Sequence, residues 1–242
     1  MQAEWRKLLM VNYKVDPEIL RPYLPAHTEL AFWQNTCYIS LVGFRFLKVR
    51  MAGIPVPFHT NFTEVNLRFY VKQKSMVGLR SPQEGEWRYG VVFLKEMVAL
   101  PIVSFVANTV YQEHYETHPV RHIITESEKE IFTQYQWKKE NAWHSMSIHA
   151  ELAPFLIEEN TPEYFLTAQH WGFTAANKQK TYVYAVHHPH WEMYKTLRHS
   201  LQIDYKIAFG ERFGFLDQQA PDSVFLVEGS AITLNKKAVI VP

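Results

Sequence analysis

Hydrophobic and polar residues alternate with a period of two along much of the chain, which predicts a fold built mainly from β-strands. The alternation is sharpest in residues 62–72. One face of this segment carries the polar residues Glu64, Asn66, Arg68 and Tyr70, and the other carries the apolar residues Val65, Leu67, Phe69 and Val71. The further segments that favour strands are residues 37–46, 89–94, 143–150, 181–187, 203–209, 223–228 and 232–234.

Short helices are predicted between some of these strands. Residues 16–24 and residues 161–169 each open with a capping side chain followed by a proline, which is typical of a helix start. Apolar positions along one side of residues 101–111 indicate a third helix. Residues 126–139 are polar and fit either a helix or a strand with a loop.

The charge balance excludes one large class of partners. The 242 residues include 25 Lys and Arg and 24 Asp and Glu, which leaves a formal net charge of +1. A chain so close to neutral lacks the positive field that non-specific phosphate binding needs, so we expect no nucleic-acid partner. No linker, charge run or repeat divides the chain. We therefore expect one domain over residues 1–242, with an antiparallel, strand-dominated α+β fold.

Cys37 is the single cysteine, so no disulfide can form within the chain. We interpret it as a packing residue because it lies in an alternating apolar strand. The first residues include an acid and no apolar stretch, which argues against a signal peptide. No segment approaches the roughly 18 consecutive apolar residues of a membrane span. We therefore expect a cytoplasmic protein without a membrane partner.

The polar face of residues 62–72 is the most informative chemical feature. A carboxyl, an amide and a guanidinium group follow one another at every second residue, as Glu64, Asn66 and Arg68. This face is either turned to solvent over an apolar core or lines an enclosed pocket. Arg45 favours the pocket, because an Arg on an otherwise apolar strand face normally binds an acid or an anion. The alternative for Arg45 is a side chain that reaches solvent at the end of its strand.

The histidine-rich segments lack the spacing of a metal site. His114 and His118 are four residues apart, but the acid between them is one position away from the zincin arrangement. The cluster His187, His188 and His190 contains a proline, which is typical of a turn. Nucleotide-binding loops and a nucleophile elbow are also absent from the sequence. We therefore expect no metal and no cofactor.

Several segments fall in the order seen in one bacterial protein family. They are Trp5 with Leu8 and Leu9, and residues 15–25, 38–45, 62–71, 90–94, 171–174, 188–191 and 225–229. On these segments the chain resembles the YqjF-like family, a domain of unknown function, over nearly its whole length. The resemblance implies a fold similar to that of acetoacetate decarboxylase: a closed or conical β-barrel around a pocket, with a few short flanking helices.

The same resemblance argues against decarboxylation through an imine. The decarboxylases form the imine on one of two adjacent lysines, and the corresponding positions here are Tyr115 and Glu116. Lys95 is the remaining candidate for an imine-forming lysine, and it would lie on another wall of the pocket. It directly follows an apolar strand, where desolvation would suit it to imine formation, but it can equally pair with Glu96.

The resemblance therefore implies a pocket without the pair of lysines. We expect Glu64 and Tyr115 as the catalytic residues. The residues expected to bind the substrate are Arg45, Asn66, Arg68 and Tyr111. We expect the ligand to be a small organic acid or carbonyl metabolite, and the activity to be that of a cofactor-independent lyase or isomerase. The alternatives are a ligand-binding barrel without catalysis, and a structural homo-oligomer that contacts its copies through residues 238–242.

Overall fold

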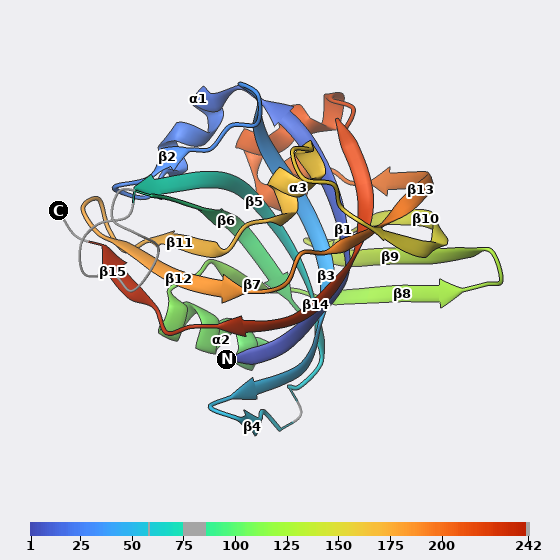
Figure 1. Ribbon diagram of the computed structural model, residues 1–242, viewed down its shortest axis with the longest axis horizontal. Coiled ribbons are helices and arrows are strands. Elements are labelled where there is room, and N and C mark those ends of the chain that lie inside the picture. Colours follow the sequence, from blue (N-terminus) through green and yellow to red (C-terminus); the bar gives the residue numbers. More distant parts are fainter. Residues whose placement is uncertain (58, 75–85, 241–242) are drawn as a thin grey trace.

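The structure is a computed structural model dominated by one strongly curved sheet (Figure 1). It describes residues 1–57, 59–74 and 86–240, without the side chains of residues 110 and 111. The predicted fold class is confirmed, because the strands pair mainly in the antiparallel sense and the helices are few and short. Among the described residues, no helix has the length and apolar character needed to span a lipid bilayer.

Seven strands pair side by side into a ring. In ring order they are β1 (Gln2–Val15), β3 (Cys37–Met51), β5 (Phe62–Lys74), β6 (Trp87–Val98), β11 (Trp171–Ala175), β12 (Thr181–His187) and β14 (Ser223–Leu234). The ring closes because β14 pairs with both β1 and β12. Within the ring, only the pair of β6 with β11 is parallel. These strands therefore present one inner and one outer face.

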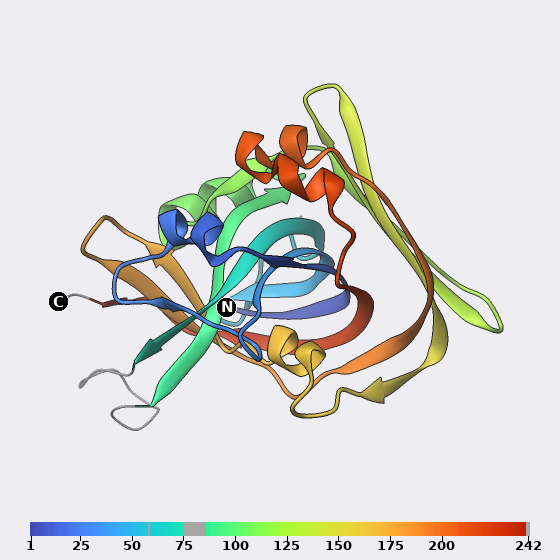
Figure 2. The ribbon, with the colours of Figure 1, turned by 90° about the horizontal axis from the view of Figure 1, so that it is seen from above.

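Four further strands continue the sheet beyond β14 and fold back over the outer face of the ring (Figure 2). They are β13 (Glu192–Gln202), β10 (Ala142–Leu156), β9 (Glu130–Lys139) and β8 (Val120–Glu126). Tyr135 and Met146 from this layer pack in one apolar core with Leu41 and Leu67 of the ring. Both faces of β3 and β5 are consequently shielded from water.

Short strands complete the sheet. β2 (Glu29–Leu30) lies beside β5, β4 (Ile54–Pro55) forms a hairpin with β3, β7 (Tyr115–Thr117) lies beside β6, and β15 (Ala238–Ile240) lies beside β12. Ile240 is buried in the apolar core. Residues 238–240, which the sequence offers as an oligomer contact, are thus held in the sheet of their own chain. Residues 241 and 242 lie outside the described residues.

The three predicted helices are confirmed. They are α1 (Pro17–Leu20) with the 3-10 turn η1 (Arg21–Tyr23), α2 (Pro101–Val106) with the π-helical turn η2 (Ala107–Tyr111), and α3 (Pro162–Thr167). The side chain of Asp16 accepts a hydrogen bond from the N–H of Glu18, and that of Thr161 accepts one from the N–H of Tyr164. The capping signals in the sequence therefore start helices as expected.

One predicted strand is wrong. The alternation in residues 203–209 indicates a strand, but they contain the helix α4 (Tyr205–Phe209), which is followed by the 3-10 helix η3 (Glu211–Gln218). The carboxylate of Asp204 accepts a hydrogen bond from the N–H of Ile207 at 2.8 Å. This capping contact starts a helix, and it outweighs the short alternating pattern.

The sequence pattern does not predict two long strands, β1 and β13. It also leaves residues 126–139 undecided between a helix and a strand. Residues 126–139 consist mainly of the strand β9. β1 escapes prediction because its register shifts between Arg6 and Leu9, which interrupts the alternation. β13 escapes because most of its residues are exposed on both faces, so that no apolar period marks it.

Candidate functional site

The inner face of the ring surrounds a cavity of about 220 Å³. Every ring strand contributes side chains to its wall, together with residues of α2 and α3. The polar residues of the wall are His59, Glu64, Asn66, Arg68, Glu96, Glu113, Tyr115, Thr167, Gln169 and Tyr184. Most other lining residues are aliphatic or aromatic. An apolar cavity with a few convergent polar groups is typical of a small-molecule binding site.

Three of the predicted site residues reach this cavity from β5. Glu64, Asn66 and Arg68 follow one another on its inner face, and all three line the cavity. Glu64 and Asn66 are each 1% exposed, and Arg68 is 7% exposed. The alternative that this face is turned to solvent is therefore wrong.

Glu64 is held by two hydrogen bonds and is deprived of water. The amide of Asn66 donates to Oε1 at 2.9 Å, and the hydroxyl of Tyr115 donates to Oε2 at 2.6 Å. Burial raises the pKa of Glu64 to about 7, although both hydrogen bonds and the charge of Arg68 act against this rise. At neutral pH, this carboxyl group can therefore both give up and take up a proton.

Arg68 is a buried cation without an acidic partner. Its Nη2 donates to the carbonyl oxygen of Leu166 at 3.3 Å, and its Nε is buried without a hydrogen-bond partner. Among the residues that the structure describes, no carboxylate forms an ion pair with it. A buried guanidinium group is normally paired with an anion. The side chain is thus prepared to receive one from a ligand.

Glu96 enters the cavity through a β-bulge in β6. The register of β6 against β5 shifts by one residue at Leu94. Because side chains alternate along a strand, one extra residue reverses which of the following residues face inward. Glu96 consequently lines the cavity, whereas Lys95 lies outside it and pairs with Glu116.

Burial and the neighbouring acids raise the pKa of Glu96 and so favour its neutral form. Burial raises its pKa well above the ordinary value, and the nearby Glu113 and Glu64 raise it further. Its Oε2 is buried without a hydrogen-bond partner. Burial also raises the pKa of Glu113 to about 7, although the hydroxyls of Thr174 and Tyr184 act against this. The cavity therefore holds three carboxyl groups that remain largely protonated below neutral pH.

One of the predicted residues is not brought to this wall. Arg45 pairs with Thr63, so it lies on the outer face of the ring, opposite to Glu64. Burial lowers the pKa of His122 on that face, and the charge of Arg45 lowers it further. The side chain of Tyr111 lies outside the described part of the structure. Tyr115, in contrast, lies beside Glu96 because β7 pairs with β6.

Sequence reasoning missed two acids and one phenol of the cavity. Glu96 is hidden by the bulge, and Glu113 lies in a segment between η2 and β7 that has no periodic pattern. Tyr184 shares a strand face with Val186, which also lines the cavity. The alternation in residues 181–187 was therefore the available signal for Tyr184.

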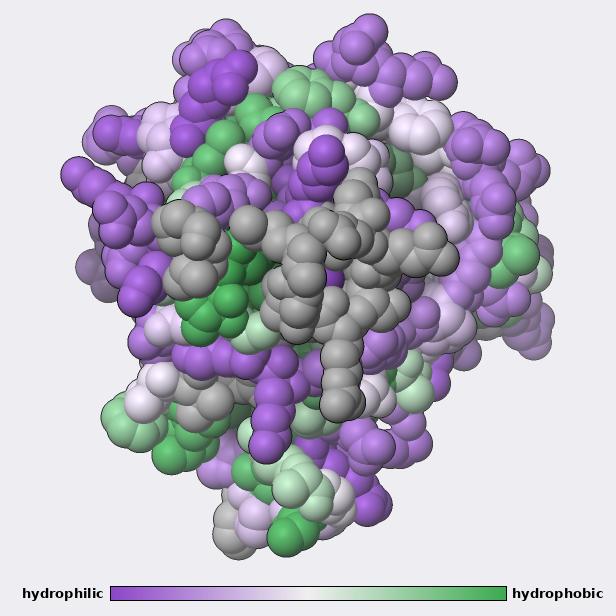
Figure 3. Space-filling model, turned by 60° about the vertical axis from the view of Figure 1, so that its left-hand side comes forward, coloured by the Kyte–Doolittle hydropathy of each residue, from purple (hydrophilic) through white to green (hydrophobic). Residues whose placement is uncertain are grey.

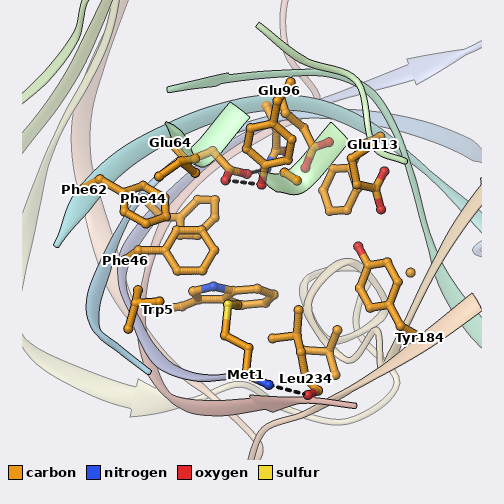
Figure 4. Close-up of a pocket in the computed structure, with 18 of the residues that line it drawn as sticks. Met1, Trp5, Phe44, Phe46, Phe62, Glu64, Glu96, Glu113, Tyr184 and Leu234 are labelled. Carbon is orange, nitrogen blue, oxygen red and sulfur yellow. Dashed lines mark hydrogen bonds between the residues drawn. The ribbon is translucent and has the colours of Figure 1, made fainter. Parts of the chain in front are cut away.

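Aromatic side chains continue the wall of the cavity from Glu64 toward Trp5 (Figure 4). Trp5 lies against Phe44 and Phe46, with ring centroids 5.4 and 5.8 Å apart. Phe46 stacks in turn on Phe62, with centroids 4.6 Å apart. The cavity thus has a carboxyl-rich side and an aromatic side.

The cavity approaches the surface beside α2 and the hairpin of β3 with β4. Three of its lining residues there are partly exposed: Met51 by 36%, Val106 by 38% and Ile102 by 47%. The face of the molecule seen in Figure 3 is mostly hydrophilic and carries separate hydrophobic patches. Through these side chains the wall of the cavity reaches the surface.

The histidine cluster stabilises the wall near α3. His188 stacks on Trp191, with ring centroids 4.1 Å apart, and on His170 at 4.4 Å. Its Nε2 lies 3.2 Å from the carbonyl oxygen of Gln169. Burial lowers the pKa of His188, so its ring is neutral and packs as an aromatic group. Within the described residues, no three His, Cys, Asp or Glu side chains are placed to hold a metal ion.

Comparison with known proteins agrees with this architecture. The chain is similar to the uncharacterized protein YqjF of Bacillus subtilis strain 168, with 26% identity over 193 residues that cover 79% of this chain and 74% of YqjF. Its structure is similar to acetoacetate decarboxylase from Legionella pneumophila, with a TM-score of 0.66 and 11% identity over 99% of this chain and 86% of the decarboxylase. It is also similar to the enduracididine biosynthesis enzyme MppR complexed with pyruvate, with a TM-score of 0.64 and 13% identity over 99% of this chain and 90% of MppR.

These comparisons confirm the predicted resemblance and the fold that it implies. At such low identity, the solved structures show a shared fold alone. Residues 2–231 match the family model DUF2071, which is described as an uncharacterized conserved protein. Since this match spans nearly all of the sequence, the chain belongs to the DUF2071 family.

Proposed function

We propose that the cavity binds a small organic acid or carbonyl compound, and that the protein is a cofactor-independent lyase or isomerase. The observation that carries the proposal is a buried cation without an acidic partner on the same strand face as a proton carrier. Arg68 lacks an anion, and Glu64 has a pKa of about 7. The first group would hold a carboxylate, and the second would move a proton.

The chemistry follows from these two positions. Ionised Glu64 takes a proton from a carbon next to the carbonyl group of the ligand. The electron pair of that C–H bond forms a carbon–carbon double bond, and the π pair of the C=O bond moves to the oxygen. Once Glu64 is protonated, the hydroxyl of Tyr115 is no longer needed by its carboxylate. This hydroxyl and that of protonated Glu96 then donate hydrogen bonds to the resulting enolate oxygen. Glu64 then returns the proton to the same carbon or to another one, so that charge and atoms balance. Asn66 keeps Glu64 in place.

Lysine chemistry is not part of the proposal. No lysine lines the cavity among the described residues, and Lys95 is paired with Glu116. We expect borohydride reduction in the presence of pyruvate to leave the mass of the protein unchanged. A lysine adduct would contradict the cofactor-independent proton transfer described above. The structural relative MppR is complexed with pyruvate, which supports a small keto acid as the kind of ligand to test.

The test uses a panel of keto acids in D₂O. NMR measures the rate of hydrogen–deuterium exchange at the carbon next to the carbonyl group of each acid. We expect the wild-type protein to accelerate exchange for at least one acid. Glu64→Gln should lower this rate at least about a hundredfold, because a positioned proton carrier contributes that much. Arg68→Gln should weaken binding roughly 10- to 100-fold through the lost charged hydrogen bonds. Glu116→Gln, which changes an acid outside the cavity, is the control and should exchange at the wild-type rate.

The rival is a binding protein without catalysis, and the apolar wall favours it. Binding that depends on Arg68 but produces no exchange would establish this alternative and contradict the enzyme. Failure of every acid to bind would contradict both.

We also propose a reducing compartment, such as the cytoplasm, as the location. Cys37 is buried and unpaired. Burial raises the pKa of its thiol to about 11, so it is protonated and unreactive at neutral pH.

A further inference from the structure

The spacing of residues along β5 shows how far apart the lining side chains of this strand lie. Phe62, Glu64 and Arg68 lie on the same strand face. At about 3.3 Å per residue, the Cα atom of Arg68 lies roughly 13 Å from that of Glu64 and roughly 20 Å from that of Phe62. The guanidinium group of Arg68 contacts Leu166 of α3. The cation and the aromatic wall are therefore at different ends of the cavity.

The entrance lies at the aromatic end. Glu64 pairs with Val98, and α2 begins three residues later at Pro101. Ile102 of α2 therefore lies on the Phe62 side of Glu64, and it is both partly exposed and in contact with the cavity. A ligand that enters here passes apolar side chains before its head group reaches Arg68.

The cavity volume limits the size of the ligand. An apolar cavity of about 150 Å³ accommodates benzene, which has six carbon atoms. In the same proportion, 220 Å³ holds about nine non-hydrogen atoms. Three of these belong to a carboxylate group, which leaves about six carbon atoms for the body of the ligand.

We infer that the ligand is a monocarboxylic acid with an apolar alkyl or aryl body of about six carbon atoms. Its carboxylate lies at Arg68, its middle passes Glu64, and its body rests on Phe46 and Phe62 near the entrance. This inference deepens the proposed function and rests on it. The inferred ligand differs from short hydrophilic keto acids, because such molecules would make no contact with the aromatic wall.

The experiment is isothermal titration calorimetry with straight-chain carboxylates of four, six, eight and ten carbon atoms, and with the alcohols of the same lengths. We expect the affinity to rise roughly three- to fourfold for each added methylene up to about eight carbon atoms, as buried apolar area increases, and then to level off. Octanol should bind at least tenfold more weakly than octanoate.

Three variants assign the contacts. Arg68→Gln should remove the preference for octanoate over octanol. Ile102→Asn should weaken octanoate binding and leave butanoate binding unchanged, because only the longer acid reaches α2. Phe105→Asn is the matched control: Phe105 lies on the same helix, is 66% exposed and does not line the cavity. It should bind both acids like the wild type.

The outcomes separate this inference from the proposed function. If butanoate binds in an Arg68-dependent way and octanoate binds no more tightly, the apolar ligand is contradicted while the organic-acid site stands. If no acid binds, both are contradicted. If acids and alcohols bind equally well and Arg68→Gln has no effect, the role of Arg68 is contradicted, and both claims fall with it.

Discussion

Glu64 and Glu116 show how the surroundings of a carboxyl group determine its charge. Burial raises the pKa of Glu64 to about 7, because its two hydrogen bonds do not replace the lost water. Burial acts in the same direction on Glu116, but hydrogen bonds with Lys139 and Lys95 outweigh it and lower its pKa to about 2. One acid is thus suited to proton transfer, and the other is charged at neutral pH.

These opposite shifts predict opposite effects of pH on stability. Glu64 has a pKa of about 7 in the folded protein and an ordinary value of 4.5. The folded state therefore holds an extra proton between these values, and the resulting stability is lost as pH rises through about 7. Because Gln does not ionise, the variant Glu64→Gln does not lose this stability as pH rises. Relative to the wild type, the variant should gain on the order of 3 kcal/mol between pH 5 and pH 8.

Urea unfolding of both proteins at pH 5 and pH 8 measures this gain. Glu116→Gln is the control with the opposite sign. Since the pKa of Glu116 is lowered, its contribution is present above pH 4.5 and is lost as pH falls through about 2. This variant should be less stable than the wild type at pH 7, and the difference should shrink in acid. If the free energy of unfolding changed equally with pH in the wild type and in Glu64→Gln, the raised pKa of Glu64 would be contradicted.

The ring of strands depends on a close approach between β6 and β11. Gly90 pairs with Trp171 in the one parallel pair of the ring. A Cβ atom at Gly90 would lie 2.2 Å from the carbonyl oxygen of Trp171, which is too close for any side chain. The absence of a side chain at this position therefore permits the ring to close around the cavity.

Gly90→Ala should push β11 outward and lower the free energy of unfolding by about 1–3 kcal/mol or more. Gly214→Ala is the matched control, because its nearest neighbour is the side-chain Cβ of Lys206 at 3.2 Å. It should change the free energy of unfolding by less than about 1 kcal/mol. Urea unfolding measures both values. A Gly90→Ala variant as stable as the wild type would show that closure of the ring does not require this contact.

Elements with regular alternation could be predicted from the sequence, and those with an interruption could not. β5 alternates without a break, so the sequence correctly groups Glu64, Asn66 and Arg68 on one face. The extra residue at Leu94 in β6 reverses the faces, and it hides Glu96 from any argument based on alternation. Short capping signals also compete with alternation, as the contact of Asp204 in α4 shows.

At the scale of the whole molecule, the two layers of the sheet have different roles. The strands β8, β9, β10 and β13 cover the outer face of the ring, so its inner face is free to carry unpaired polar groups around a cavity. Sequence alternation predicts neither which face is covered nor how the ring closes, because both depend on contacts between distant segments. The resemblance to a known family provided this part of the fold.

The central claim is that Arg68 receives the carboxylate of an organic acid inside the ring. A crystal structure grown with 6-bromohexanoate tests this most directly, because this acid fits the size limit set by the cavity and the anomalous signal of bromine locates it. We expect the carboxylate within hydrogen-bonding distance of the guanidinium group of Arg68, and the bromine near Phe46 and Ile102. An empty cavity at saturating ligand, or a carboxylate bound away from Arg68, would contradict the account.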